Sequence, residues 1–436
     1  MSTTLPPGVV SIDMLGPRSL YVGAGIALPQ ESTPPVGRAR PDSLAVLGAG
    51  VMGASIAAVA AAQGFRVALA DSRPEAFDNI YPRLAAELSP NGEPDRRMLD
   101  ALRRRVEVQA ADHRVAQCNL VLETIVENLP TKRQLYARLE PQLPPDAVLA
   151  SNTSSIPIAD LAATLTDPGR FCGIHFFHPV RQRPLVEVIR GPQTREQTIA
   201  AAVAFARNLG KTPIVVGDGP GFLVNRMLMP YLAEGLELLL DGATLEQIDA
   251  AATRFGMALG PIRALDEIGI DTSLLAGRVF YQAFPDRAIP SPIILMLYKR
   301  KRLGRKSGAG FFLYPPELKP DEPGLPDPAV DAIVSEWARP PRRFSEEEIL
   351  DRLLLPMALE ATRLLEERRV TDPRVIDLGA VLGLGFPSNH GGPLCWADRI
   401  GLPRIIDKLS ALAGLGPRME PTPLLRDLAA AGRSFH

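Results

Sequence analysis

The 436-residue sequence is 46% hydrophobic and 22% charged, the composition of an ordinary folded protein of two or three domains. The formal net charge of -1 argues against nucleic acid or an anionic membrane as a partner, so any anionic ligand requires a local basic cluster. The three cysteines lack metal-ligand spacing, which favours a reduced, cytoplasmic protein without a metal site. No apolar run is long enough to span a bilayer.

The chain opens with a proline-rich stretch, residues 1–41, which predicts an arm or linker. A β-type run, Ser43–Leu47, then meets GAGVMG, an alanine-rich helical segment covers Ala54–Gln63, and a second β-type run covers Arg66–Ala70. This order predicts the βαβ unit that binds a dinucleotide, with the phosphates at the helix N-terminus. Three glycines would provide the tight turn, the approach of the pyrophosphate and the close helix packing: Gly48, Gly50 and Gly53.

Asp71 ends the second β-type run, 18 residues after Gly53. A carboxylate at this place accepts hydrogen bonds from the adenosine ribose hydroxyls and repels a 2′-phosphate. The pattern therefore favours NAD over NADP, although Arg73 nearby moderates the preference.

Two further β-type runs end in polar loops, Leu120–Glu123 before TIVENLPTK and Ala147–Ala150 before SNTSS. The carboxyl ends of parallel strands meet at one sheet edge, where open α/β folds bind ligands. Four polar side chains are expected there: Glu127, Lys132, Asn152 and Ser154. The ordinary alternative for each of them is a capping or turn residue.

His175 and Glu187 lie on two short apolar runs, Phe171–Phe177 and Leu185–Ile189. The connection between these runs is too short for a parallel crossover, so they are expected to pair antiparallel. A hairpin centred on Arg181 places the two residues opposite each other on one face of the sheet. The sequence therefore predicts an imidazole backed by a carboxylate.

A helix around Arg195–Leu209 and a strand over Thr212–Val216 complete this domain, and the chain after GDGPGF is expected to be helical. Helices are predicted over Leu223–Leu240, from a Thr244–Gln247 capping box to Phe255, over Pro261–Tyr281 and over Pro292–Leu297. A basic run then extends from Lys299 to Lys306. It is either a solvated face or a site for the phosphates of coenzyme A or an acidic carrier protein.

The last part of the chain repeats the previous one, after a proline-rich linker and a capping-box pattern at Ser345 and Glu348. The order of the matches is kept while their offset drifts from 126 to 132 residues, as expected of a duplicated helical domain. The matched residues are Pro230, Glu234 and Leu238 with Pro356, Glu360 and Leu364; Ile248 and Asp249 with Ile376 and Asp377; and Gly260, Pro261, Asp266 and Gly269 with Gly392, Pro393, Asp398 and Gly401.

These patterns predict an α/β fold in which a Rossmann-type nucleotide-binding domain is followed by two repeated all-α domains. The predicted divisions are an N-terminal arm or linker over 1–41, the Rossmann domain over 42–217, a first helical domain over 218–314, a proline-rich linker with a short helix over 315–344, and a second helical domain over 345–436.

Seven motifs follow one another along the chain: LAVLGAGVMG, ETIVENLPTK, ASNTSSIPI, GIHFFHPV with LVEVI, GPGFLVNR, LGPIRALDEIGIDT and GRKSGAGF. In this order and spacing they resemble the 3-hydroxyacyl-CoA dehydrogenase family. The run GLGFPSNHGG, with the second helical repeat, is similar to the C-terminal half of the bacterial multifunctional fatty-acid oxidation subunit. The hydratase half of that subunit has no counterpart in the sequence.

The resemblance implies reversible, NAD-dependent oxidation of an L-3-hydroxyacyl thioester of coenzyme A or of an acyl carrier. It implies that NAD is held by Gly48, Gly50, Val51, Met52, Gly53, Asp71, Glu127, Lys132 and Asn152. His175 would be the catalytic base and Glu187 would orient it, while Ser154 and Asn225 would contact the reacting end of the substrate. Lys299 and Lys306 are candidate contacts for the substrate's phosphates.

One position departs from the family pattern, because His178 stands where the family has asparagine in HFFNP. We expect His178 to bind substrate and not to serve as a second base. Two alternatives stay open: a catalytically divergent NAD-binding partner protein, and a specialised dehydrogenase for carrier-bound thioesters in a biosynthetic pathway instead of β-oxidation. Family members pair through their helical domains, so the second copy predicts a pseudo-dimeric monomer or a homodimer.

Overall fold

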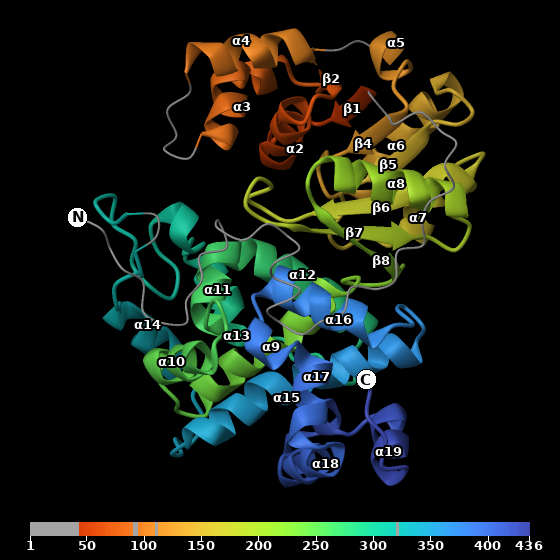
Figure 1. The fold of residues 1–436 in the computed structure, drawn as a ribbon. Coiled ribbons are helices and arrows are strands. Elements are labelled where there is room, and N and C mark those ends of the chain that lie inside the picture. The colour runs from red at the N-terminus through yellow and green to blue at the C-terminus, as the bar shows by residue number, and fades with distance from the viewer. Residues whose placement is uncertain (1–42, 90–94, 110–111, 320–321) are drawn as a thin grey trace. The chain divides into compact units, whose positions relative to one another are not determined.

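The computed structural model describes residues 43–89, 95–109, 112–319 and 322–436, so the predicted arm over 1–41 lies outside the described part. The described residues form two compact units (Figure 1). The first unit comprises the described residues up to Thr153, Ile158–Val215 and Ser388–Gly391. The second comprises the described residues of Ser154–Pro157, Val216–Pro387 and Gly392–His436.

The described part of the first unit contains an eight-stranded sheet in the order β3-β2-β1-β4-β5-β6-β7-β8. The strands are β1 (Ser43–Leu47), β2 (Arg66–Ala70), β3 (Val106–Val108), β4 (Leu120–Glu123), β5 (Val148–Ser151), β6 (Phe171–Phe176), β7 (Leu185–Arg190) and β8 (Thr212–Gly217). Strands β1 to β6 run parallel to one another, and β7 runs antiparallel to β6. The predicted Rossmann-type fold is therefore confirmed.

Helices cover both faces of this sheet (Figure 1). They are α2 (Val51–Ala62), α3 (Ile80–Leu88), α4 (Arg96–Arg105), α5 (Asp112–Val115), α6 (Leu129–Leu139), α7 (Ile158–Ala162) and α8 (Glu196–Asn208). On one face α2 and α8 share a core with Cys172, Ile174 and Phe176 of β6. The alternate β6 residue Phe171 contacts Tyr136 of α6 on the other face. His175 therefore points to the α6 face.

The second unit is helical, as the sequence predicts, and both repeats lie within it. The helices of the first repeat are α9 (Val224–Leu240), α10 (Leu245–Phe255), α11 (Pro261–Ile268), α12 (Ile270–Ala283) and α13 (Pro292–Lys299), and α14 (Pro328–Ser335) follows. Those of the second repeat are α15 (Glu346–Glu366), α16 (Pro373–Gly379), α17 (Pro393–Ile400), α18 (Leu402–Ala411) and α19 (Pro423–Ala430). In the described residues no helix is long and apolar enough to cross a membrane.

Aspartates at matched positions accept the same backbone hydrogen bonds in both repeats. Asp249 accepts two backbone N–H groups in the first turn of α11, at 2.9 and 3.1 Å, and Asp377 does the same for α17, at 2.8 and 3.1 Å. Asp266 accepts the N–H groups of residues 311 and 312, and Asp398 accepts those of residues 435 and 436. The duplication seen in the sequence is thus matched bond by bond.

The two repeats pack against each other through α9 and α15. Each of these helices has a buried arginine that forms an ion pair with a glutamate of the other helix. Arg226 donates to Glu360 and Arg352 donates to Glu234, both at 2.9 Å. The two arginines and the two glutamates are each 126 residues apart, so the interface is an internal two-fold arrangement. Burial raises the pKa of Glu360, but the surrounding arginines lower it by a larger amount. The net pKa therefore lies below its ordinary value, and the carboxyl group is held ionised.

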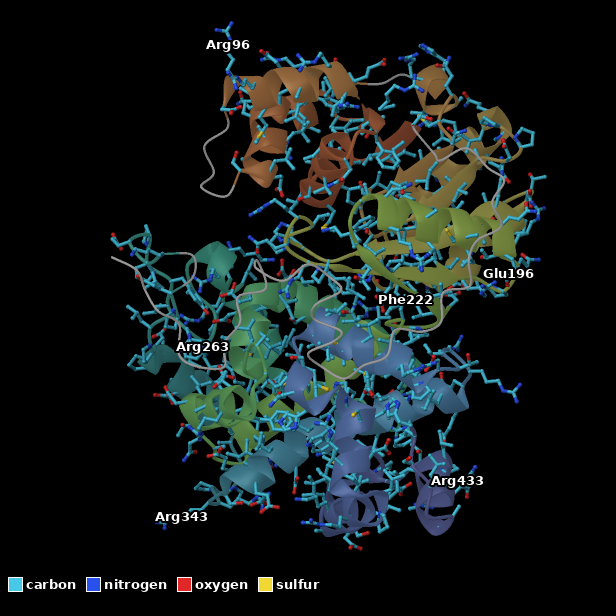
Figure 2. All side chains as sticks on the ribbon, in the orientation of Figure 1. Arg96, Glu196, Phe222, Arg263, Arg343 and Arg433 are labelled. Carbon is cyan, nitrogen blue, oxygen red and sulfur yellow. The ribbon has the colours of Figure 1, made fainter. Side chains whose placement is uncertain are left out.

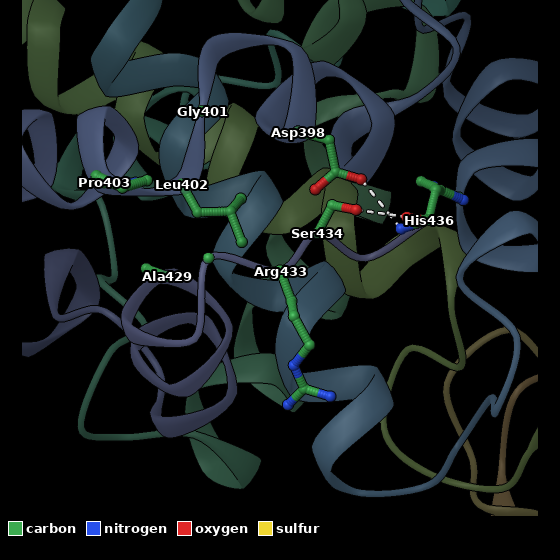
Figure 3. Close-up of a pocket in the computed structure, with 9 residues that line it drawn as sticks. Asp398, Gly401, Leu402, Pro403, Ala429, Arg433, Ser434 and His436 are labelled. Carbon is green, nitrogen blue, oxygen red and sulfur yellow. Dashed lines mark hydrogen bonds between the residues drawn. The ribbon is translucent and has the colours of Figure 1, made fainter.

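The repeats differ beside Asp398, where a pocket of about 520 Å³ is lined by Leu402, Pro403 and Ala429 among other residues (Figure 3). In the first repeat the equivalent place holds an ion pair of 2.5 Å between Lys306 and Asp271. Pro403 corresponds to Asp271, and the second repeat therefore lacks half of this pair. The pocket contains none of the predicted site residues.

We predict that Arg352→Met lowers the free energy of unfolding by about 3 kcal/mol, because it leaves the buried Glu234 carboxylate with fewer charged partners. The matched control is Arg254→Met, whose ion pair with Glu346 also joins the repeats but is exposed. That change is expected to cost far less stability, because an ion pair in contact with water contributes little. Urea unfolding followed by circular dichroism measures both, and equal losses would contradict the account.

A second prediction concerns pH. The hydrogen bond between the His436 imidazole and Asp377, 2.8 Å long, raises the pKa of His436 above its ordinary 6.5, although burial opposes the shift. Because the pKa of His436 is higher in the folded state than in the unfolded chain, the protonated imidazole stabilises the folded state fully below pH 6.5. This stabilisation is lost as pH rises through the raised pKa. The stability difference between the native chain and His436→Ala should therefore shrink from pH 6 towards alkaline pH. A difference that grows with pH would contradict this.

Candidate functional site

The glycine turn after β1 has the geometry that a dinucleotide cradle requires. Gly48 has a φ of +108°, a conformation that side chains disfavour. A Cβ on Gly53 would lie 1.8 Å from the Gly48 carbonyl oxygen, so only glycine allows α2 to start this close to the turn. A Cβ on Gly50 would meet no atom within 4 Å. The first turn of α2, with the exposed Val51 and the half-buried Met52, thus begins beside open space that a pyrophosphate fits.

Asp71 lies just beyond β2 and is tied to the same turn. Its carboxylate accepts the N–H of Ala49 at 2.8 Å and the N–H of Arg73 at 2.9 Å. Burial raises the pKa of Asp71, but these hydrogen bonds together lower it by a larger amount. The net pKa therefore lies below its ordinary value, and the carboxyl group is held ionised. An ionised acceptor at this place suits ribose hydroxyls, as the sequence predicts.

Glu123, at the carboxyl end of β4, is the buried centre of the next part of the site. It accepts hydrogen bonds from Lys132 at 2.7 Å, Tyr136 at 2.5 Å and Ser151 at 2.7 Å. Burial and the Glu123 charge raise the pKa of Tyr136 well above its ordinary value, so its hydroxyl stays protonated as a donor. The sequence did not identify Glu123 or Tyr136, because an acid ending an apolar strand gives no sign of three partners.

Glu127 and Lys132 lie together, as expected, but in different environments. Lys132 is only 1% exposed and its ammonium lies 3.2 Å from Glu127, whose side chain is 37% exposed. Glu127 also accepts the hydroxyl of Thr153 at 2.6 Å. Within the first unit, Glu127 is therefore accessible to a ligand, and Lys132 is placed to hold Glu127 in position.

His175 and Glu187 pair in the register that the sequence predicts. They are direct cross-strand partners in β6 and β7, and Nδ1 of the imidazole lies 2.7 Å from a Glu187 carboxylate oxygen. Both side chains are buried, at 7% and 0% exposure. The Phe177 ring packs edge-on against the imidazole, with centroids 4.6 Å apart. With Nδ1 bonded to the carboxylate, Nε2 is the nitrogen placed to exchange a proton with a ligand.

The hairpin that carries this pair is held at both ends. Asn152 accepts the N–H of Phe176 at 2.9 Å, which fixes β6 directly after His175. Lys211 donates to the carbonyls of Val180 and Arg183 in the connection between β6 and β7. Burial, with a smaller contribution from the charge of Arg181, lowers the pKa of Lys211 to about 8. Lys211 could not be identified from sequence patterns, because its acceptors are backbone carbonyls.

Ser154 and Asn225 belong to the second unit. Asn225, in the first turn of α9, donates its amide to the Ser154 carbonyl at 3.5 Å, across 71 residues of sequence. The structure thus brings these two predicted site residues together. His178 lies in the connection between β6 and β7 and is exposed.

The basic run is largely engaged within the second unit. Ion pairs join Arg300 to Glu336, Arg302 to Asp327, Arg305 to Glu267 and Lys306 to Asp271. The side chains of Lys299 and Lys301 form no hydrogen bond or ion pair with the described residues, and both residues are exposed. The predicted phosphate contact thus rests more on Lys299 than on Lys306, whose charge Asp271 already offsets.

Comparison with known proteins shows which family the chain matches. The family model described as 3-hydroxyacyl-CoA dehydrogenase, NAD binding domain, matches residues 43–219. The model for the C-terminal domain of the same family matches residues 221–314 and 349–434, which correspond to the two helical repeats.

Solved structures agree. 3-Hydroxybutyryl-CoA dehydrogenase from Escherichia coli K12 is 27% identical over 90% of this chain and 99% of its own, with a TM-score of 0.78. The dehydrogenase part of multifunctional enzyme 1 from C. elegans is 25% identical over 94% of this chain and 97% of its own, with a TM-score of 0.67. (S)-3-Hydroxybutyryl-CoA dehydrogenase from Ralstonia eutropha is 33% identical over 63% of this chain and 99% of its own, with a TM-score of 0.59.

We predict that Gly50→Ala raises the Kd for NADH by about tenfold or more, because its methyl group would occupy the space of the pyrophosphate. The folded chain should keep its thermal midpoint, since the added Cβ meets no protein atom within 4 Å. A control is Gly277→Ala in α12, where a Cβ also meets nothing. Fluorescence titration with NADH and thermal melts test this, and unchanged NADH affinity in Gly50→Ala would refute the placement.

Proposed function

Because the chain belongs to the 3-hydroxyacyl-CoA dehydrogenase family and carries its NAD-binding domain, we propose that it interconverts L-3-hydroxyacyl and 3-ketoacyl thioesters with a His–Glu pair as general acid and base. The observation that carries the proposal is the buried 2.7 Å contact between His175 and Glu187, in the unit that also forms the dinucleotide turn. Such a pair is the arrangement that proton transfer at a carbinol requires.

In the oxidative direction, Nε2 of His175 takes the proton of the C3 hydroxyl group as the oxygen becomes a carbonyl. NAD⁺, when bound, supplies the acceptor for the C3 hydride. In the reverse direction the imidazolium returns the proton to the 3-keto oxygen. An imidazole suits both directions, because its ordinary pKa of about 6.5 lies near neutral pH.

Glu187 supports this cycle by its position. Its carboxylate accepts Nδ1–H, which fixes the tautomer that leaves Nε2 able to take a proton, and it stabilises the imidazolium once the proton has moved. The carboxylate is fully buried, so its charge acts through a medium with little water to screen it. Glu187 thus positions His175 so that Nε2 faces the reacting proton.

On the substrate side, we assign the reacting end of the thioester to Ser154 and Asn225. The contact of the Asn225 amide with the Ser154 backbone carbonyl supports the assignment, since it holds the two residues next to each other at the start of α9. A Ser154 hydroxyl donated to the 3-keto oxygen would stabilise the charge that develops there on reduction. His178, exposed in the loop after β6, is assigned to substrate choice.

Two of the similar structures are 3-hydroxybutyryl-CoA dehydrogenases, which makes acetoacetyl-CoA the first substrate to test. We place the activity in the cytoplasm and in fatty acid metabolism, in β-oxidation or in a biosynthetic pathway. A carrier-protein thioester in place of the CoA ester is the second candidate substrate, for which the exposed Lys299 offers a cation.

The catalytic assignment predicts that His175→Asn lowers kcat with acetoacetyl-CoA and NADH by roughly 10²- to 10⁴-fold while the Kd for NADH stays unchanged. Glu187→Gln should lower kcat as well, because it removes the charge that favours the imidazolium. The control is Glu196→Gln, an exposed acid on α8 paired with Arg190. Stopped-flow loss of NADH absorbance measures all three. Native turnover in His175→Asn would overturn the mechanism, and an inactive native chain that binds NADH would favour the divergent partner protein.

The internal two-fold interface leads to a prediction of assembly. The α9 and α15 helices already cover each other within the chain, so we propose a pseudo-dimeric monomer. Light scattering after size exclusion should give a mass near 47.0 kDa. A mass twice as large, independent of dilution, would instead establish a homodimer.

A further inference from the structure

A pocket of about 640 Å³ lies at the far edge of the sheet from the dinucleotide turn, within the first unit. It is lined by Ser43 and Arg66, the first residues of the parallel strands β1 and β2. The glycine turn follows the opposite, carboxyl end of β1. The two places are therefore separated by the length of the strands, and the pocket is no part of the nucleotide cradle.

The lining of this pocket is strongly cationic. Among the described lining residues, five are arginines and one, Glu107, is acidic, so the formal charge is +4 in a chain whose net charge is -1. The arginines are Arg66, Arg103, Arg104, Arg105 and Arg114, from β2, the last turn of α4 and α5. A concave surface of one sign concentrates an ion of the opposite sign.

Neutral groups hold two of these arginines in place, so their positive charge is largely left for a ligand. Arg105 donates to the carbonyl of Gly64 at 2.6 Å, a neutral partner. The guanidinium of Arg103 lies over the Tyr81 ring, 5.6 Å from its centroid, and 3.7 Å from the half-exposed Asp100. Inside the pocket, the charge of Arg114 is offset by Glu107 at 2.8 Å.

Arg104 completes the set. It is exposed, and its guanidinium group forms no hydrogen bond or ion pair with any described residue. A guanidinium presents parallel N–H donors in a fork that fits two oxygens of a phosphate group. The pocket also has the volume typical of small-molecule sites, and Tyr81 adds an aromatic wall.

We propose that this arginine pocket binds a phosphorylated small molecule with at least two negative charges, at a site distinct from the NAD site. The inference rests on the pocket's own residues and is independent of the proposed reaction. Several guanidinium groups converge on a space that a phosphate or diphosphate fills, and the single acid of the lining is already paired with Arg114.

The test is calorimetric titration of the full chain with inorganic pyrophosphate at about 50 mM salt, where charged contacts are weakly screened. Saturating NADH is present throughout, so that pyrophosphate cannot bind at the glycine turn. Binding with a Kd of about 1 mM or tighter is expected. The variant Arg103→Gln with Arg104→Gln should weaken it at least about tenfold, since charge-assisted hydrogen bonds are lost.

The matched control is Arg96→Gln with Arg97→Gln, which removes the same charge from the same helix. Arg96 lies at the other end of α4, and its side chain points away from the unit (Figure 2). Equal weakening in both variants, or no binding to the native chain, would overturn the proposal. A poly-glutamate peptide is titrated in parallel, and tighter binding of that peptide than of pyrophosphate would assign the pocket to an acidic protein segment and overturn the phosphate class.

Discussion

The structure depends on buried carboxylates, because an ionised group inside a protein is stable only with charged or hydrogen-bonding partners at fixed positions. Glu187 meets the imidazole of His175, and Glu123 meets Lys132 and two hydroxyl groups. In the second unit, Glu234 and Glu360 each meet arginines from the other repeat. The same requirement thus fixes the orientation of the His175 imidazole, the carboxyl edge of the sheet and the packing of the helical repeats. In the first unit this pairing orients polar side chains, and in the second unit it sets how the two repeats pack.

Much of the first unit followed from local rules of the sequence. The register of His175 with Glu187 was predictable, because a short connection forces antiparallel pairing and the period of two then fixes which residues face each other. The roles of Gly48 and Gly53 were predictable too, since a strand–turn–helix pattern restricts the backbone there. The strand β3 was not predicted, because three residues after an arginine-rich helix show no periodicity.

What the sequence did not show was the partner of each polar residue. Lys132 resembles a cofactor contact in the sequence, but its burial against Glu123 depends on two strands and a helix coming together. The partners Arg226 and Glu360 are 134 residues apart, and Lys211 bonds to backbone carbonyls. No spacing rule encodes such pairings. The matched positions of the repeats were visible, whereas their reciprocal ion pairs required the packing of α9 on α15.

The central claim is that the imidazole held by Glu187 exchanges the proton at C3 of a thioester. A crystal structure of the chain with NADH and acetoacetyl-CoA tests it most directly. The account predicts Nε2 of His175 within about 3.2 Å of the 3-keto oxygen, with Nδ1 still on Glu187. A 3-keto oxygen bound by other donors, with His175 out of reach, would contradict it.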